Sequence, residues 1–268
     1  MFIPLKDRNQ LKRIKLQYVT LALIVINCLV YVGVNLAGAP DFVEALVVQL
    51  GYIPAVVNDF EELPPALVVI PEELSLVSYA FLHADFMHLA SNMIFLWVFG
   101  DNIEDALGHV RFLIFYLLCA VAGGLTHGLM DPASTAPLIG ASGAIAGIIG
   151  AYLILHPRVR VWVLVLMRIP LPLPAWIPLL GWIGFQIYML LIAGDEMVSW
   201  AAHVGGFFAG CILVLFMKRR GVPLFDLEIK EPKAVVRSVP SVKRNGSIQR
   251  PQPAGHEPEK TKVWGRGK

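Results

Sequence analysis

Long runs of apolar residues recur along most of this chain and are separated by shorter polar segments. Each run is close to the roughly 20 residues that a helix, rising about 1.5 Å per residue, needs to cross about 30 Å of hydrocarbon. The six runs cover residues 18–36, 77–99, 112–130, 138–155, 176–192 and 198–217. This pattern predicts an all-α fold, a polytopic membrane protein built as a six-helix transmembrane bundle.

The chain divides around these runs into three expected regions. Residues 1–17 form a basic N-terminal segment, residues 18–217 form the membrane domain with a long outer loop at 38–73, and residues 218–268 form a tail. Pro, Lys, Arg, Ser and Gly are frequent in the tail and no helical period survives there, which predicts a disordered basic segment.

The first run has an alternative interpretation as a cleaved signal peptide. The tripeptide Ala37-Gly38-Ala39 fits a small-residue cleavage pattern, but the apolar core before it is longer than that of a usual signal peptide. We therefore expect the first run to be retained as a membrane helix.

Composition agrees with a membrane protein, and the placement of charge predicts its orientation. Hydrophobic residues make up 56% of the chain and the mean hydropathy is +0.65, well above the values of soluble domains. Basic residues gather at one set of run ends: Lys12, Arg13, Lys15, Arg111, Arg158, Arg160, Lys218, Arg219 and Arg220. The alternate loops carry acidic residues and neither Lys nor Arg: Asp41, Glu44, Asp59, Glu61, Glu62, Glu72, Glu73, Asp131, Asp195 and Glu196. By the positive-inside rule, both termini are expected in the cytoplasm and the acidic loops outside.

Two polar signatures interrupt the fourth and sixth runs, namely Gly140-Ala141-Ser142-Gly143 and Ala202-His203-Val204-Gly205-Gly206. Polar reactive groups are costly in hydrocarbon, so they indicate a functional site. Both runs enter from the outer face, and Ser142 and His203 lie four and five residues after their starts, so we expect them at equal depth. A serine and a histidine at one depth can act as nucleophile and base.

Small residues accompany both signatures at helical spacing. His203, Gly206 and Gly210 share one helix face, and Gly143 and Gly147 lie beside Ser142. Such spacing lets membrane helices pack backbone to backbone. Each motif alone is also explained by packing, with Ser142 as an interhelical hydrogen-bonding residue, but together they predict a paired Ser142 and His203.

A third group of polar residues opens the second run. Asp85 is placed to cap the start of a helix, and His88 and Asn92, four residues apart, point the same way. Two neutral donors on one face suit an oxyanion hole, which the backbone N–H of Ser142 would complete. His83 fits a structural role.

Metal binding is the main alternative use of His83, His88 and His203. The chain contains no His-Glu-x-x-His, His83 and His88 diverge along a helix, and the three cysteines are scattered among separate runs. A second intramembrane Asp for paired-carboxylate chemistry is also missing. We expect neither a metal nor another cofactor.

Taken together, these motifs resemble the rhomboid family of intramembrane serine proteases over roughly residues 18–217, and the sequence Asn102-Ile103-Glu104 with Gly108 resembles that family's turn into its third helix. The resemblance implies a Ser–His dyad in which Ser142 is acylated and His203 carries the proton. It also implies oxyanion donors at His88, Asn92 and the Ser142 backbone, and structural roles for His83, Gly140, Gly143, Gly206 and Gly210.

Two departures from the family pattern bear on the site. Ala146 stands where some members carry an aromatic side chain that packs against the catalytic histidine, so other contacts must orient His203. The Trp-Arg pair that some members carry in the first outer loop is missing around Leu74 and Ser75. This second departure concerns how the loop is anchored.

The function expected from these features is hydrolysis of single-span membrane proteins near the outer membrane face, with entry beside a mobile fifth helix that contains Pro178, Gly181 and Gly184. The partners are membrane substrates and the lipid bilayer, with no nucleic acid, and the expected location is a prokaryotic cell (inner) membrane. Two alternatives are a non-catalytic relative that escorts membrane helices and a small transporter. A non-catalytic relative is expected to lack Ser142 or His203. A transporter is expected to have a polar site near the middle of the membrane and an internal repeat.

Overall fold

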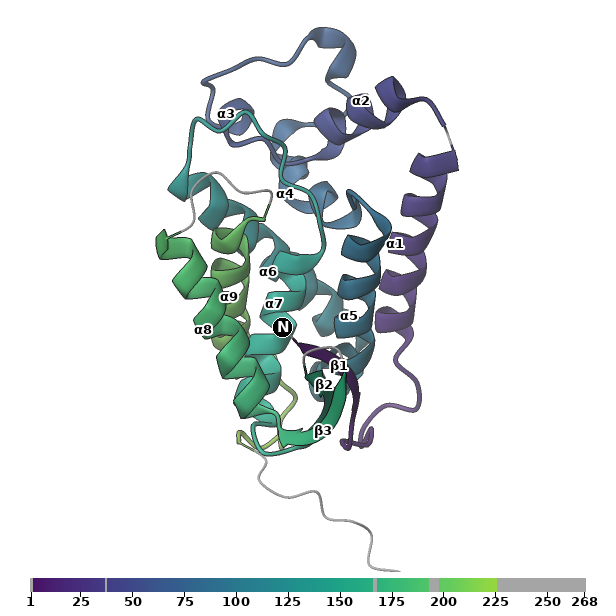
Figure 1. The fold of residues 1–268 in the computed structure, drawn as a ribbon, viewed down its shortest axis with the longest axis vertical. Helices are drawn as coiled ribbons and strands as arrows, with labels where there is room; N and C mark the ends of the chain where they lie inside the picture. The colour runs from purple at the N-terminus through teal and green to yellow at the C-terminus, as the bar shows by residue number, and fades with distance from the viewer. Residues whose placement is uncertain (1, 37, 166–167, 193–197, 226–268) are drawn as a thin grey trace, which may run out of the picture. The chain divides into compact units, whose positions relative to one another are not determined.

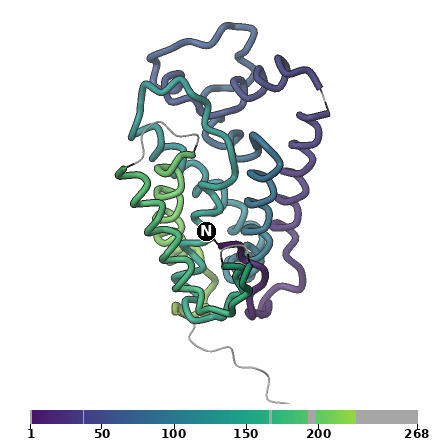
Figure 2. The backbone as a smooth tube through the Cα atoms, in the orientation of Figure 1, coloured from purple at the N-terminus to yellow at the C-terminus, as the bar shows by residue number. Residues whose placement is uncertain are grey.

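The protein is mostly helical. The computed structural model describes residues 2–36, 38–165, 168–192 and 198–225. Its α-helices are α1 (Tyr18–Leu36), α2 (Pro40–Leu50), α3 (Pro54–Val57), α4 (Ser75–Ser78), α5 (Phe86–Leu107), α6 (His109–Met130), α7 (Ser142–Leu155), α8 (Trp176–Ile192) and α9 (Trp200–Met217). Its strands are β1 (Phe2–Asp7), β2 (Arg160–Val165) and β3 (Ile169–Pro174), and its 3-10 turns are η1 (Pro65–Leu67), η2 (Glu72–Leu74) and η3 (Tyr79–Phe81). The long helices run side by side, with α2 and α3 at one end and the strands at the other (Figures 1 and 2).

Each of the six expected runs overlaps one long helix. Helices α1 and α8 have the expected bounds, whereas α7 begins four residues later than expected, at Ser142. Among the described residues, α1, α6 and α9 are long and apolar enough to cross a membrane, while α7 and α8 are shorter apolar helices. The expected tail lies outside the described residues from residue 226 onward.

Many large apolar side chains on the helices are exposed, as expected for a chain whose solvent is lipid. In α1 the exposed set is Tyr18, Val25, Ile26, Leu29, Val32 and Leu36, and in α9 it is Phe208, Ile212, Leu215 and Phe216. Apolar patches of this extent are rare on soluble monomers and typically mark contact with a membrane or a partner. The exposed surface agrees with a membrane protein.

The second run does not form the single helix 77–99 that its hydropathy predicts. The short elements α4 and η3 end at Phe81, and α5 begins only at Phe86 and continues to Leu107. The break is caused by Asp85, which has an extended backbone and accepts a hydrogen bond from the backbone N–H of His88 at 2.9 Å. The expected cap at Asp85 is confirmed, and it places His88 in the first turn of α5.

A three-stranded sheet in the order β1-β2-β3 corrects the all-α expectation. Strand β1 pairs antiparallel with β2, from Phe2 opposite Val165 to Asp7 opposite Val161. The sequence does not predict this pairing, because neither the basic segment 1–17 nor the alternating segment after Arg158 reveals its partner locally. Three prolines at alternate positions of β3 suit an edge strand, where only every second N–H faces the neighbour.

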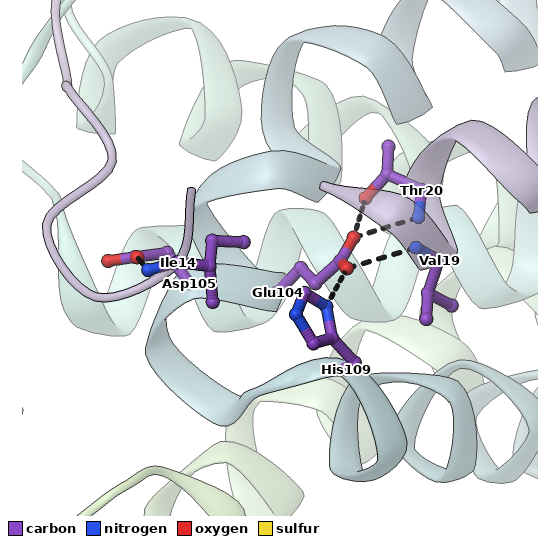
Figure 3. Close-up of polar contacts among 6 residues, drawn as sticks. All are labelled: Ile14, Val19, Thr20, Glu104, Asp105 and His109. Atoms are coloured by element: carbon purple, nitrogen blue, oxygen red, sulfur yellow. Dashed lines mark hydrogen bonds and ion pairs between the residues drawn. The ribbon is translucent and has the colours of Figure 1, made fainter. Parts of the chain in front are cut away.

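Two buried carboxylates at the end of α5 hold the N-terminal part of the chain (Figure 3). Glu104 accepts hydrogen bonds from the backbone N–H groups of Val19 at 3.0 Å and Thr20 at 2.8 Å. Asp105 accepts from the backbone N–H of Ile14 at 2.7 Å, and the His109 ring also contacts Glu104. Because the first N–H groups of a helix have no intrahelical acceptor, Glu104 caps α1 from another helix.

Asp7 fixes the end of β1 to the helices. Its carboxylate accepts hydrogen bonds from the Asn102 amide and the Tyr152 hydroxyl, both at 2.7 Å. Burial raises the pKa of the Asp7 carboxyl from 3.8 to about 6, against the opposing effect of these hydrogen bonds. A raised folded-state pKa means that the folded protein binds this proton more tightly than the unfolded chain.

Asp7 therefore makes a contribution to stability that is complete below about pH 4 and is lost as the pH rises through about 6. We expect the unfolding temperature of the protein in detergent to fall between pH 5 and pH 7, and Asp7→Asn to reduce that fall. The contribution is at most about 3 kcal/mol. Asp41→Asn, at an exposed carboxylate of α2, is the control, and an unchanged pH dependence in Asp7→Asn would contradict this assignment.

Candidate active site

Ser142 and His203 are brought together by the starts of two helices. Ser142 is the first residue of α7, and His203 lies in the first turn of α9. The distance from His203 Nε2 to Ser142 Oγ is 2.8 Å, within hydrogen-bonding range. The two residues therefore meet as the sequence predicts, although Ser142 begins its helix instead of lying one turn inside it.

Glycine contacts between α7 and α9 make this approach close enough. A Cβ atom at Gly206 would lie 2.0 Å from the backbone oxygen of Gly143, and one at Gly210 would lie 2.0 Å from that of Gly147. No side chain fits at these two crossings, so the helix backbones are in direct contact. The predicted seam of small residues is confirmed, and it sets the separation between the helix carrying Ser142 and the helix carrying His203.

His203 is oriented by side chains that the sequence did not identify. Its Nδ1 lies 2.7 Å from Oε1 of Gln186 in α8. The rings of Trp182 and Trp200 lie 5.9 and 6.3 Å from the imidazole, centroid to centroid. The aromatic neighbours of His203 therefore come from α8 and α9, and not from the position of Ala146 in α7. The available signal was a lone amide, Gln186, within the apolar fifth run.

His88 and Asn92 lie on the first two turns of α5, and His88 is close to Ser142. A Cβ atom at Gly140 would lie 2.7 Å from His88 Nε2 and 3.8 Å from Ser142 Oγ, so the ring and the hydroxyl flank the same glycine. Gly140 has φ of 123°, which favours glycine. His83 packs edge-on against His88, with ring centroids 5.1 Å apart.

Asn92 supplies a buried donor beside this group. It is 6% exposed, and its Nδ2 has no hydrogen-bond partner among the described residues. An unmade hydrogen bond on a buried donor costs about 1–3 kcal/mol. Such a donor is suited to an acceptor that arrives with a ligand.

The backbone N–H of Ser142 is a further donor, because the first N–H groups of a helix have no intrahelical acceptor. A nucleophile, a base and up to three donors for a developing oxyanion suit acyl transfer. Among the described residues, no group of three or more His, Cys, Asp or Glu side chains could hold a metal ion.

A second serine–histidine contact lies nearby and was not predicted. Ser199 Oγ caps α9 by accepting from the backbone N–H of Ala202 at 3.1 Å. The same oxygen lies 2.9 Å from Nδ1 of His127 in α6. The pair fixes the start of α9, and it offers an internal control for chemistry at Ser142.

A family model and several individual proteins that resemble this chain all indicate the same family. A family model described as "Rhomboid domain" matches residues 71–220, more than half of the chain. The chain is 31% identical over 148 residues to Rhomboid protein 1, mitochondrial, of Saccharomyces cerevisiae, covering 53% of this chain and 41% of the yeast protein. It is 32% identical over 144 residues to Rhomboid-like protease 3 of Toxoplasma gondii, covering 53% and 51%. With Rhomboid protease GluP of Bacillus subtilis it shares 40% identity over 72 residues, covering 27% and 14%. These matches span about half the length of the relatives, or less.

The contact between α7 and α9 yields a test by adding a methyl group. We expect Gly206→Ala to lower the free energy of unfolding by at least about 2 kcal/mol, because the new Cβ would meet the Gly143 backbone oxygen. Gly184→Ala, where nothing lies within 4 Å, should change it by about 1 kcal/mol or less. Denaturant titration in mixed micelles measures both, and equal effects would show that the seam is not tight.

Proposed function

The chain belongs to the rhomboid family, and we propose that it acts as an intramembrane serine endopeptidase with Ser142 as nucleophile and His203 as base. The observation that carries this proposal is the 2.8 Å contact between His203 Nε2 and Ser142 Oγ. Neither group has a stabilising reason to lie among apolar helices, where polar side chains are costly. A serine alcohol is a weak nucleophile until a neighbouring base accepts its proton.

The reaction follows from the positions of these atoms. His203 Nε2 accepts the Ser142 hydroxyl proton as Oγ attacks the carbonyl carbon of the scissile peptide bond. The resulting oxyanion receives hydrogen bonds from the Ser142 N–H, His88 and Asn92. Protonated His203 then gives its proton to the leaving amine, which leaves Ser142 acylated. A water molecule, deprotonated by His203, hydrolyses this ester and restores the free serine.

We further propose six membrane crossings by α1, α5, α6, α7, α8 and α9, with both termini in the cytoplasm. In this arrangement residues 18–217 form the protease domain, flanked by the basic segment 1–17 and the tail 218–268. Basic residues at the inner loops and acidic residues at the outer loops support the orientation. Ser142, at the outer start of α7, then faces substrates near the outer surface.

The proposed substrates are single-span membrane proteins. A helical segment hides its peptide bonds in hydrogen bonds, so it must unwind before Ser142 can attack. Gly or Pro near the cleavage site lowers the cost of unwinding. Entry beside α8 is supported by Gly181 and Gly184, because no atom of another described element lies within 4 Å of a Cβ built at either glycine.

The proposed topology does not identify the membrane in which the chain resides. The yeast relative is mitochondrial by name and another relative is bacterial. The comparisons therefore do not support the expected prokaryotic inner membrane over an organellar one. We propose an integral multi-pass protein of a lipid bilayer.

Substitution of the proposed pair tests the activity directly. In liposomes containing a single-span reporter, we expect Ser142→Ala and His203→Ala each to reduce cleavage by at least about 10³-fold, as the loss of an activated nucleophile requires. A fluorophosphonate probe should label the wild type and not Ser142→Ala.

Ser199→Ala is the matched control, because Ser199 also contacts a histidine ring. It should retain labelling and lose about 1 kcal/mol of stability through its helix cap. Undiminished cleavage by Ser142→Ala would disprove Ser142 as the nucleophile, whereas a wild type that binds the reporter without cleaving it would favour a protein that binds membrane helices without cutting them.

The oxyanion role of Asn92 predicts a split between kinetic constants. Asn92→Ala should lower kcat by about 10²- to 10³-fold with little change in KM, because the donor acts mainly on the charge of the transition state. Asn27→Ala, at a buried asparagine of α1 that donates to the Leu23 carbonyl, should leave kcat within about twofold. A raised KM with unchanged kcat in Asn92→Ala would instead indicate ground-state binding.

A further inference from the structure

We infer that Gln186 is a positioning residue, which holds the proton of His203 on Nδ1 and leaves Nε2 free to accept from Ser142. This inference rests on the proposed role of His203 as base. Gln186 does not touch the reacting atoms, and it acts through the imidazole ring.

The contacts of the His203 ring form a continuous line across three helices. Ser142 of α7 lies 2.8 Å from Nε2, and Oε1 of Gln186 in α8 lies 2.7 Å from Nδ1. Gln186 is 4% exposed, so water competes little for its amide. Both ring nitrogens of His203 therefore have protein partners.

The chemistry of a neutral imidazole makes these two contacts interdependent. The ring carries one proton, and the hydrogen bond made by one nitrogen decides whether the other is a donor or an acceptor. Because Oε1 has no hydrogen to give, Nδ1 must donate to it, which leaves a lone pair on Nε2. Only that tautomer can take the proton from Ser142 Oγ.

The aromatic neighbours of His203 cannot make this choice. Trp182 and Trp200 lie against the ring and restrict its rotation, but they contact the imidazole as surfaces and offer Nδ1 no acceptor oxygen. The amide of Gln186 is thus the contact that distinguishes the two nitrogens.

A neutral amide suits this place better than a carboxylate would. A carboxylate buried among apolar helices costs several kcal/mol unless a positive charge pairs with it throughout the cycle, and a base must be uncharged before it accepts the Ser142 proton. An amide oxygen still accepts from Nδ1–H when the ring becomes positive during proton transfer. Gln186 therefore supports both protonation states of the base without a permanent buried charge.

Two variants separate positioning from packing. Gln186→Met keeps the size of the side chain and removes the acceptor, whereas Gln186→Glu restores an acceptor oxygen. With purified full-length protein in liposomes and the single-span reporter, we expect Gln186→Met to lower kcat by about 10- to 10³-fold with KM changed by less than about threefold. Gln186→Glu should recover at least about tenfold of that loss. Ile183→Val, at a buried position of α8, is the packing control and should leave kcat within about twofold.

A spectroscopic measurement tests the positioning without requiring activity. Solid-state ¹⁵N NMR of histidine-labelled protein, with His203→Ala for assignment, should show protonated Nδ1 and unprotonated Nε2 in the wild type, and loss of this preference in Gln186→Met. A wild-type protein that shows this tautomer but cleaves no reporter would contradict the protease proposal and would still support the positioning role of Gln186. The role of Gln186 would be overturned by an equal kcat in the wild type and Gln186→Met, or by an equal loss of kcat in Gln186→Met and Gln186→Glu. A wild-type His203 ring protonated on Nε2 would overturn it as well.

Discussion

Direct backbone contact between α7 and α9 is the constraint on which the site depends. In a bilayer, helices gain no hydrophobic free energy by leaving lipid for one another, so association relies on close packing. Gly206 and Gly210 meet the carbonyl oxygens of Gly143 and Gly147, where a Cβ would lie 2.0 Å away. This distance sets the spacing of two helix starts, and the 2.8 Å contact of Ser142 with His203 follows from it.

The polar groups of the chain are divided between the two ends of α5. Its first turns carry the neutral donors His88 and Asn92, and its last turn carries Glu104 and Asp105, about 18–25 Å away at 1.5 Å per residue. The carboxylates are satisfied by backbone N–H groups of the N-terminal segment and α1. The charge of Glu104 and Asp105 thus lies at the end of α5 away from Ser142 and His203, where it fastens residues 12–14 and the start of α1 to the bundle.

The parts of the fold that depend on local patterns could be predicted from the sequence. Apolar runs located the long helices, and the spacing of Gly206 and Gly210 located the seam, because both patterns repeat with the helical period. Sequence reasoning missed the sheet, since β1 pairs with residues about 155 positions later. It also missed Gln186, because hydropathy does not say which face of α8 turns toward α9. The sequence predicted that Asp85 caps a helix, but it did not predict that the preceding helical segment ends before Asp85.

The position of Gln186 links access to the site with orientation of the base. Among the described residues, no atom of another element lies within 4 Å of a Cβ built at Gly181 or Gly184, whereas Gly206 and Gly210 of α9 are in backbone contact with α7. Helix α8 is thus open on the face where these two glycines lie, and it supplies the acceptor for His203 Nδ1. If substrates enter beside α8, as proposed, its outward movement withdraws that acceptor, and its return restores the tautomer that can deprotonate Ser142. Proton transfer would then be efficient only after the helix has closed on a bound segment.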